Sequence, residues 1–148
     1  MFSLKNIYKK LIYIIFVKHL EKSAKMTSEQ KKALLLLKSV IFHYHGLDED
    51  EKSMLEQTAK ELDAYEELEW ANNFVSEDYY TAFERSRAYL NEVVSPLDNE
   101  TKLSYLKTVW NANMAKGYIS EIEATALLKL AKDWHIQKEL IQFVRNRD

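Results

Sequence analysis

Glycine and proline are almost absent from this chain, and their scarcity limits the folds that it can adopt. The 148 residues include two glycines, Gly46 and Gly117, and one proline, Pro96. Sheet-based folds of this length need many tight turns, which usually draw on glycine, proline or Asn-Gly pairs. Long helices need only a few connections, and a hydrophobic content of 47% is enough to form a core. The sequence therefore predicts an all-α fold in one domain.

The composition also excludes several kinds of chemistry. The chain has no cysteine, which rules out a disulfide framework, a cysteine-ligated zinc site and a thiol nucleophile. Two distant glycines cannot form a phosphate-binding loop. The helical pattern offers no strand-turn-helix elbow for a serine nucleophile, and the Glu-x-x-His pattern of di-iron bundles does not occur. We therefore predict that the protein is not an enzyme.

Charge is divided unevenly along the chain. Residues 1–25 hold six lysines and one glutamate, a net charge of +5, whereas residues 26–148 hold 15 basic and 22 acidic residues, a net charge of −7. An acidic body repels phosphate backbones, so we expect no nucleic-acid partner. The apolar run 11–17 is too short for a bilayer, which takes about 20 apolar residues in a helix.

Three interpretations of residues 1–25 stay open. The segment is an interfacial helix that makes weak contact with a membrane surface, or a helix that buries Ile12, Ile15 and Phe16 against the bundle. The third interpretation places the true start at Met26, directly before a helix-start signal. In each case we separate residues 1–25, a basic and apolar helical segment, from residues 26–148, the helical domain.

Capping residues and apolar periodicity mark the helices of the body. Thr27 with Gln30, and Ser120 with Glu123, fit the capping box, in which side chains satisfy the first free amide groups of a helix. Residues 33–37 and 40–42 are apolar nearly all round the helix, which predicts a buried central helix over 29–45 that Gly46 ends. The other predicted helices cover 49–63, 65–74, 76–94, 97–115, 120–134 and 137–145, with Tyr79 and Ile122 facing inward.

An internal repeat relates two pairs of these helices. Each copy is an apolar helix, a glycine turn, an N-cap residue, a glutamate three residues later and a second apolar helix. The copies run from Leu35 to Leu62 and from Leu106 to Trp134, and an offset of 72 pairs Asp48 with Ser120 and Glu51 with Glu123. The repeat predicts a single compact bundle of six or seven helices, built from two pseudo-repeated helical hairpins, plus the N-terminal helix.

The repeat resembles the TerB family of helical domains, which is named for tellurite-resistance operons. In the family pattern an apolar helix ends in Ala-Asp-Gly, and a glutamate follows six residues after the glycine. Here Ala115-Lys116-Gly117 leads to Glu123 at that spacing, and Tyr44-His45-Gly46 leads to Glu51 five residues on. Over residues 28–145 the resemblance implies an all-α module without enzymatic activity in a stress-response context. One group of members joins the domain to a J-domain behind an N-terminal membrane anchor.

The sequence departs from the TerB pattern where the family has an acidic ion-binding patch. The family's aspartate before the glycine is His45 in one copy and Lys116 in the other. A lysine removes an oxygen ligand and adds a repelling charge, which weakens the case for a Ca²⁺-like or Mg²⁺-like site.

A divalent metal site is nevertheless one prediction for the glycine turns. His43, His45, Asp48, Asp50 and Glu51 lie within nine residues and carry atoms that transition metals bind. His43 and His45 would point about 200° apart on a helix, so they cannot bind one ion together unless the helix unwinds. Helix capping is the alternative role of the acidic residues. The predicted ligands are Asp48, Glu51 and Glu123, and no other cofactor is expected.

The chain between the two hairpins is rich in aromatic residues and carboxylates. The aromatic residues are Tyr65, Trp70, Phe74, Tyr79, Tyr80, Phe83 and Tyr89, and the carboxylates are Glu66, Glu67, Glu69, Glu77 and Asp78. A helix face can bury only part of this set. The remainder is typical of a partner-binding surface, whereas packing between the hairpins is the alternative.

These observations lead to one functional prediction and one alternative. The prediction is a non-enzymatic TerB-like interaction module that binds a protein partner through its acidic and aromatic surface. The alternative is a divalent-metal or ion-binding sensor that uses the glycine turns. The expected location is cytoplasmic, either free or peripheral at the inner face of the membrane, and a homodimer is one further arrangement.

Overall fold

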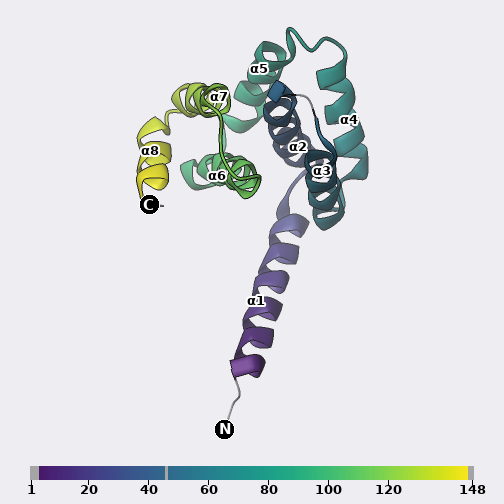
Figure 1. The fold of residues 1–148 in the computed structure, drawn as a ribbon, viewed down its shortest axis with the longest axis vertical. Helices are drawn as coiled ribbons and strands as arrows, with labels where there is room; N and C mark the ends of the chain where they lie inside the picture. The colour runs from purple at the N-terminus through teal and green to yellow at the C-terminus, as the bar shows by residue number, and fades with distance from the viewer. Residues whose placement is uncertain (1–3, 46, 147–148) are drawn as a thin grey trace.

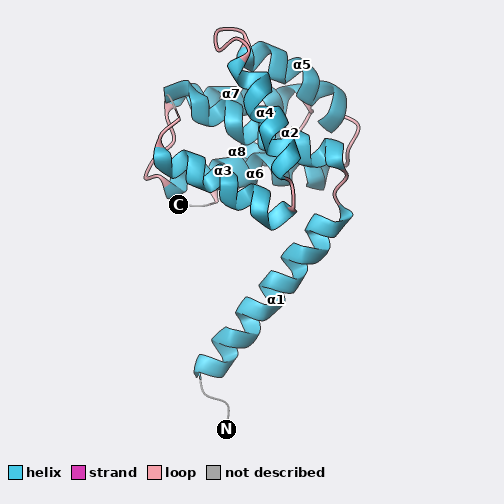
Figure 2. Ribbon diagram, turned by 90° about the vertical axis from the view of Figure 1, so that its right-hand side faces the viewer, coloured by secondary structure: helices cyan, strands magenta, loops and turns pink. Residues whose placement is uncertain are grey.

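The structure, a computed structural model, describes residues 4–45 and 47–146, with residues 16–25 and 45 described by their backbone alone. Its elements are α1 (Leu4–Lys25), α2 (Ser28–Phe42), the 3₁₀ turn η1 (His43–His45), α3 (Glu49–Leu62), α4 (Tyr65–Ser76), α5 (Ala82–Val94), α6 (Asn99–Ala115), α7 (Glu121–Asp133) and α8 (Gln137–Arg145) (Figure 1). No strand occurs within these described ranges, which confirms the all-α prediction. The helices after α1 form one compact bundle (Figure 2).

Helix α2 is the centre of the bundle. The ten residues from Ala33 to Phe42 are all buried, and α2 packs against α3, α4, α5 and α6. Its capping box forms as predicted, because Thr27 Oγ1 accepts a hydrogen bond from Gln30 N and Gln30 Oε1 accepts one from Thr27 N. The prediction of a buried central helix is confirmed. Gly46, expected to end it, lies outside the described residues.

The C-terminal helices α7 and α8 pack on each other and on α6. Gly117 follows α6 with a φ of 116°, a backbone conformation that favours glycine. The second capping box then begins α7, with Ser120 N donating to Glu123 Oε1 and Glu123 N donating to Ser120 Oγ. Helix α8 has the predicted bounds. The chain turns between α7 and α8 at His135, a non-glycine residue with a φ of 59°, which places the fully buried Trp134 against the core.

Several sequence predictions about helix limits and faces are wrong. Helix α5 begins at Ala82 rather than at residue 76, because Asp78 accepts hydrogen bonds from Tyr80 N and Thr81 Oγ1 and holds the intervening chain in a turn. Tyr79 is therefore exposed rather than inward. Ile122 is also exposed, since the buried position in the first turn of α7 belongs to Glu123. Helix α6 begins at Asn99, after the cap Asp98.

Helix α1 extends away from the bundle (Figures 1 and 2). Every side chain described in it, from Leu4 to Ile15, is exposed. Ile12 and Ile15 therefore do not pack against the bundle, contrary to one of the three interpretations, while the side chain of Phe16 lies outside the described set. Within the described residues, no helix combines the length and the apolar character that crossing a bilayer requires.

Candidate functional site

Two of the three predicted metal ligands converge on one lysine. Glu51 and Glu123 each occupy the third position of their helix, α3 and α7, and are 4% and 2% exposed. Lys116 Nζ lies 3.1 Å from Glu51 Oε2 and 3.6 Å from Glu123 Oε2. The ring centroid of Phe42 lies 4.7 Å from the same Nζ, within the range of a cation–π contact. We call these four residues the Lys116 cluster.

In the Lys116 cluster, burial and the charge of Lys116 have opposite effects on the pKa of Glu51. Burial raises the pKa of Glu51 above its usual value, and the hydrogen bond from Lys116 opposes this rise. One ammonium group is shared by two carboxylates, so Lys116 supplies the positive charge that a cation held between them would supply. The cluster is an internal ion pair network that ties the first turn of α3 to the first turn of α7.

The third predicted ligand, Asp48, is directed elsewhere. Its Oδ1 accepts a hydrogen bond from Glu51 N at 2.8 Å, which is the role of an N-cap. Nearby, His43 Nδ1 donates to the Ser39 carbonyl oxygen at 2.6 Å, while the side chain of His45 lies outside the described set. In the part of the chain that the structure describes, no three His, Asp or Glu side chains gather as they would around a metal ion.

The aromatic stretch divides into a packed part and an exposed part. Trp70, Phe74 and Tyr89 form a cluster between α4 and α5, with ring centroids 5.0–6.0 Å apart. Tyr89 Oη also donates to Glu29 on α2 at 2.6 Å. Packing thus accounts for these three rings, although it joins α4 to α5 rather than one predicted hairpin to the other.

The rings left exposed do not form one surface. Tyr65 is 58% exposed at the start of α4, whereas Tyr79 and Tyr80 are 61% and 101% exposed after its end. The 12 residues of α4 separate these two places by about 16 Å along the helix axis. The aromatic and acidic surface that the sequence suggested as one unit is therefore two separate regions.

The α4–α5 loop, residues 77–81, is held in place by Arg85. The guanidinium of Arg85 donates from Nη1 to the Phe74 carbonyl oxygen and from Nη2 to the Asp78 carbonyl oxygen, both at 2.8 Å, and from Nε to Thr81 Oγ1 at 2.9 Å. Asp78 in turn accepts from Tyr80 N and Thr81 Oγ1, each at 3.0 Å. The loop thus presents Tyr80 to solvent from a backbone fixed at both ends.

Tyr79 is anchored differently from Tyr80. Its ring stacks on His43 with centroids 5.5 Å apart and planes 28° apart, which connects the α4–α5 loop to the end of α2. Tyr80, in contrast, is 101% exposed and projects into solvent. Sequence reasoning named both tyrosines but not Arg85. The position of Arg85 in the sequence, four residues after Thr81, does not indicate that its side chain donates to the Phe74 carbonyl oxygen.

Sequence reasoning also missed a buried lysine on α2. Lys38 is 7% exposed, and its Nζ donates to Thr58 Oγ1 on α3 at 2.7 Å. Burial lowers the pKa of Lys38, and the charge of Glu61 offsets part of that effect. The residue borders an open groove of about 530 Å³ between α3 and α6. Its position in the apolar run Leu34–Phe42 was the only signal in the sequence, since a lysine there must either be buried or interrupt the core.

Comparisons with protein families, with curated proteins and with solved structures find no significant match to this chain. The geometry of the described residues is therefore the basis for the functional argument that follows.

Proposed function

We propose that this chain is a non-enzymatic, TerB-like interaction module that binds a protein partner through the α4–α5 loop. The observation that carries the proposal is the complete exposure of Tyr80 on a loop that Arg85 and Asp78 hold with five hydrogen bonds. A large aromatic side chain in solvent is free to bury its area against another protein. Because the loop is already ordered, binding would cost little additional conformational entropy.

The charges of the loop define the chemistry of the partner. Glu77 and Asp78 precede the two tyrosines, and Arg85 lies 3.7 Å from Glu77 Oε2. The two carboxylates outnumber this one guanidinium, so the loop retains a net negative charge. We therefore expect a protein surface with an apolar pocket for Tyr80 and basic residues around it. The proposal has two further parts. The protein acts in a stress response, as the TerB resemblance implies, and its bundle is built from two pseudo-repeated helical hairpins.

Site-specific photo-crosslinking tests this function. A crosslinking amino acid replaces Tyr80 in the full chain, which is then expressed in its native cells. Tyr118 is the matched control, because it is 70% exposed on the α6–α7 turn. We expect one dominant crosslinked protein from position 80 and none from position 118. When Tyr79→Ala is combined with the crosslinking amino acid at position 80, the amount of this product should fall at least tenfold. Equal products from both positions, or none from position 80, would contradict the proposal.

The ion-sensor alternative has weaker support from the geometry. Glu51 and Glu123 do approach each other, but Lys116 already lies between them and Asp48 caps α3. A divalent cation would have to displace the positively charged ammonium group of Lys116, which would repel it. Calorimetric titration of the full chain with Ca²⁺, Zn²⁺ and Mn²⁺ distinguishes the two functions. We expect no saturable heat, whereas saturable binding lost in Glu123→Gln would favour the sensor.

A further inference from the structure

The outer half of α1 carries an apolar face whose side chains are exposed. Its members recur at helical spacings of three and four and are between 45% and 74% exposed: Leu4, Ile7, Tyr8, Leu11, Ile12, Ile14 and Ile15. At about 100° per residue, these side chains cover an arc of about 160° on one side of the helix, while Tyr13, which is 68% exposed, lies on the opposite side. Globular proteins seldom leave so many neighbouring apolar side chains in water without a binding role.

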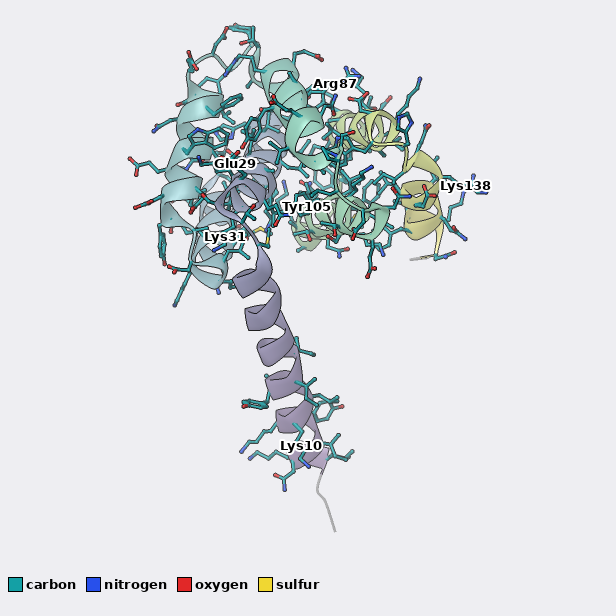
Figure 3. The ribbon with its side chains drawn as sticks, turned by 180° about the vertical axis from the view of Figure 1, so that it is seen from behind. Lys10, Glu29, Lys31, Arg87, Tyr105 and Lys138 are labelled. Atoms are coloured by element: carbon teal, nitrogen blue, oxygen red, sulfur yellow. The ribbon has the colours of Figure 1, made fainter. Side chains whose placement is uncertain are left out.

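Lysines border this apolar face on both sides. Relative to Leu4, Lys5 lies about 100° around the helix in one direction and Lys10 about 120° in the other, with Lys9 on the opposite face. Figure 3 shows Lys10 on the outer part of α1, well away from the bundle. A helix with an apolar face bounded by lysines is suited to lie in a lipid interface, with its apolar side chains among the acyl chains and its ammonium groups among the head groups.

The charges and the width of the face indicate which occupant fits best. The segment Leu4–Ile15 contains no carboxylate, so a second copy of the helix would bring lysines to lysines without a counter-charge. The face also includes Tyr8, Ile12 and Ile15, which makes it wider than the two-position seam of a coiled coil. In addition, the next position of that repeat, seven residues after Leu11, is Lys18. Anionic head groups supply negative charge along the whole segment.

We propose that Leu4–Ile15 is an interfacial helix that attaches the protein to an anionic lipid surface. Its 12 residues span about 18 Å, too short for a hydrocarbon core of about 30 Å, so the helix lies along the surface. The net charge of −7 on residues 26–148 keeps the body off the same surface. The attachment uses no residue of the α4–α5 loop and is independent of partner binding there.

Vesicle co-sedimentation of the full chain tests this proposal. The vesicles contain phosphatidylcholine alone or a mixture with phosphatidylglycerol, each at low and at high salt. We expect binding to the anionic vesicles only, weakened at high salt, and at least tenfold weaker for Leu11→Asp. The matched control Ile122→Asp changes an equally exposed isoleucine on α7 and should leave binding unchanged. Each of Lys5→Gln and Lys9→Gln should weaken binding by about fivefold.

Folding and self-association are followed in the same samples. Leu11 is exposed, so the melting temperature of Leu11→Asp should equal that of the wild type. The proposal fails if the chain does not bind anionic vesicles, if it binds neutral vesicles equally well, or if Leu11→Asp binds as strongly as the wild type. A dimer in sedimentation equilibrium that Leu11→Asp dissociates, together with absent vesicle binding, would assign the face to a second copy of the chain instead.

Discussion

Two lysines of this protein lie in different surroundings, Lys38 buried and Lys116 half-buried, and the comparison shows what stabilises a charge that is partly or fully removed from water. Lys38 on α2 meets the Thr58 hydroxyl, and burial lowers its pKa. Lys116 after α6 meets two carboxylates and the Phe42 ring. Removing a charged group from water costs free energy, and a hydrogen bond to a hydroxyl offsets only part of that cost. At Lys116 the two buried carboxylates need a nearby cation, so the positive charge of the lysine stabilises their burial. The same substitution should therefore have opposite effects at the two sites.

The largest expected effect is the loss of Lys116. Lys116→Met leaves Glu51 and Glu123 buried beside each other without a cation, and we expect the free energy of unfolding to fall by about 3–5 kcal/mol at pH 7.5. Urea denaturation measures this change. Part of the loss should be recovered as the pH is lowered, because burial raises the pKa of Glu51 and its protonation removes one of the two negative charges. A loss below 1 kcal/mol would show that water or rearrangement already solvates the two carboxylates.

The opposite sign is expected at Lys38. Lys38→Met replaces a buried ammonium with an apolar side chain of similar length, so we expect the free energy of unfolding to rise by about 1 kcal/mol. The exposed Lys138 on α8 provides the control, because Lys138→Met should change stability very little (Figure 3). Thermal and urea denaturation of the three chains measure the difference. If Lys38→Met destabilises the fold, the bond to Thr58 contributes more than the burial costs.

The N-caps beside the Lys116 cluster should contribute less than the lysine does. Asp48→Ala and Ser120→Ala each remove the acceptor for a backbone N–H in the first turn of a helix, with an expected cost of about 1 kcal/mol. Urea denaturation at pH 7.5 ranks these variants against Lys116→Met. Caps as costly as the lysine would mean that local capping, rather than the ion pairs, fixes the first turns of α3 and α7.

The smallest expected effect is a pH dependence that comes from Glu51. Because burial raises its pKa in the folded state, the folded chain binds this proton more tightly than the unfolded chain does. The contribution of Glu51 to stability therefore falls as the pH rises from the usual value of 4.5 through the raised pKa. Glu51→Gln removes this dependence, so its stability relative to the wild type should improve between pH 4.5 and 7.5. A constant difference across that range would contradict the assignment.

Local signals in the sequence predicted most of the fold. Thr27 with Gln30 and Ser120 with Glu123 marked helix starts because a capping box is made within four residues. The start of α5 was missed because Asp78, which forms the intervening turn, was treated as one carboxylate among several. Ile122 was placed inward by periodicity, although the first turn of α7 buries the glutamate beside it.

The candidate site was harder to predict because its contacts are distant in the sequence. Glu51 and Lys116 are 65 residues apart, and only the packing of α3 beside the end of α6 brings them together. The resemblance to the TerB pattern marked Lys116 as the loss of a ligand, whereas the structure shows the same residue as the partner of both glutamates. Likewise, the exposure of Tyr80 depends on the length of the α4–α5 loop, which periodicity did not give.

The Lys116 cluster also bears on how parts of the protein open. Phe42 ends α2, Glu51 and Glu123 lie in the first turns of α3 and α7, and Lys116 follows α6, so four helix ends meet at one ammonium group. Helix ends normally fray one by one, and their amide hydrogens exchange with solvent at unrelated rates. Here the opening of any one end would break an ion pair or the cation–π contact that joins it to the other ends. The amide hydrogens at these four ends should therefore exchange together, as one cooperative unit.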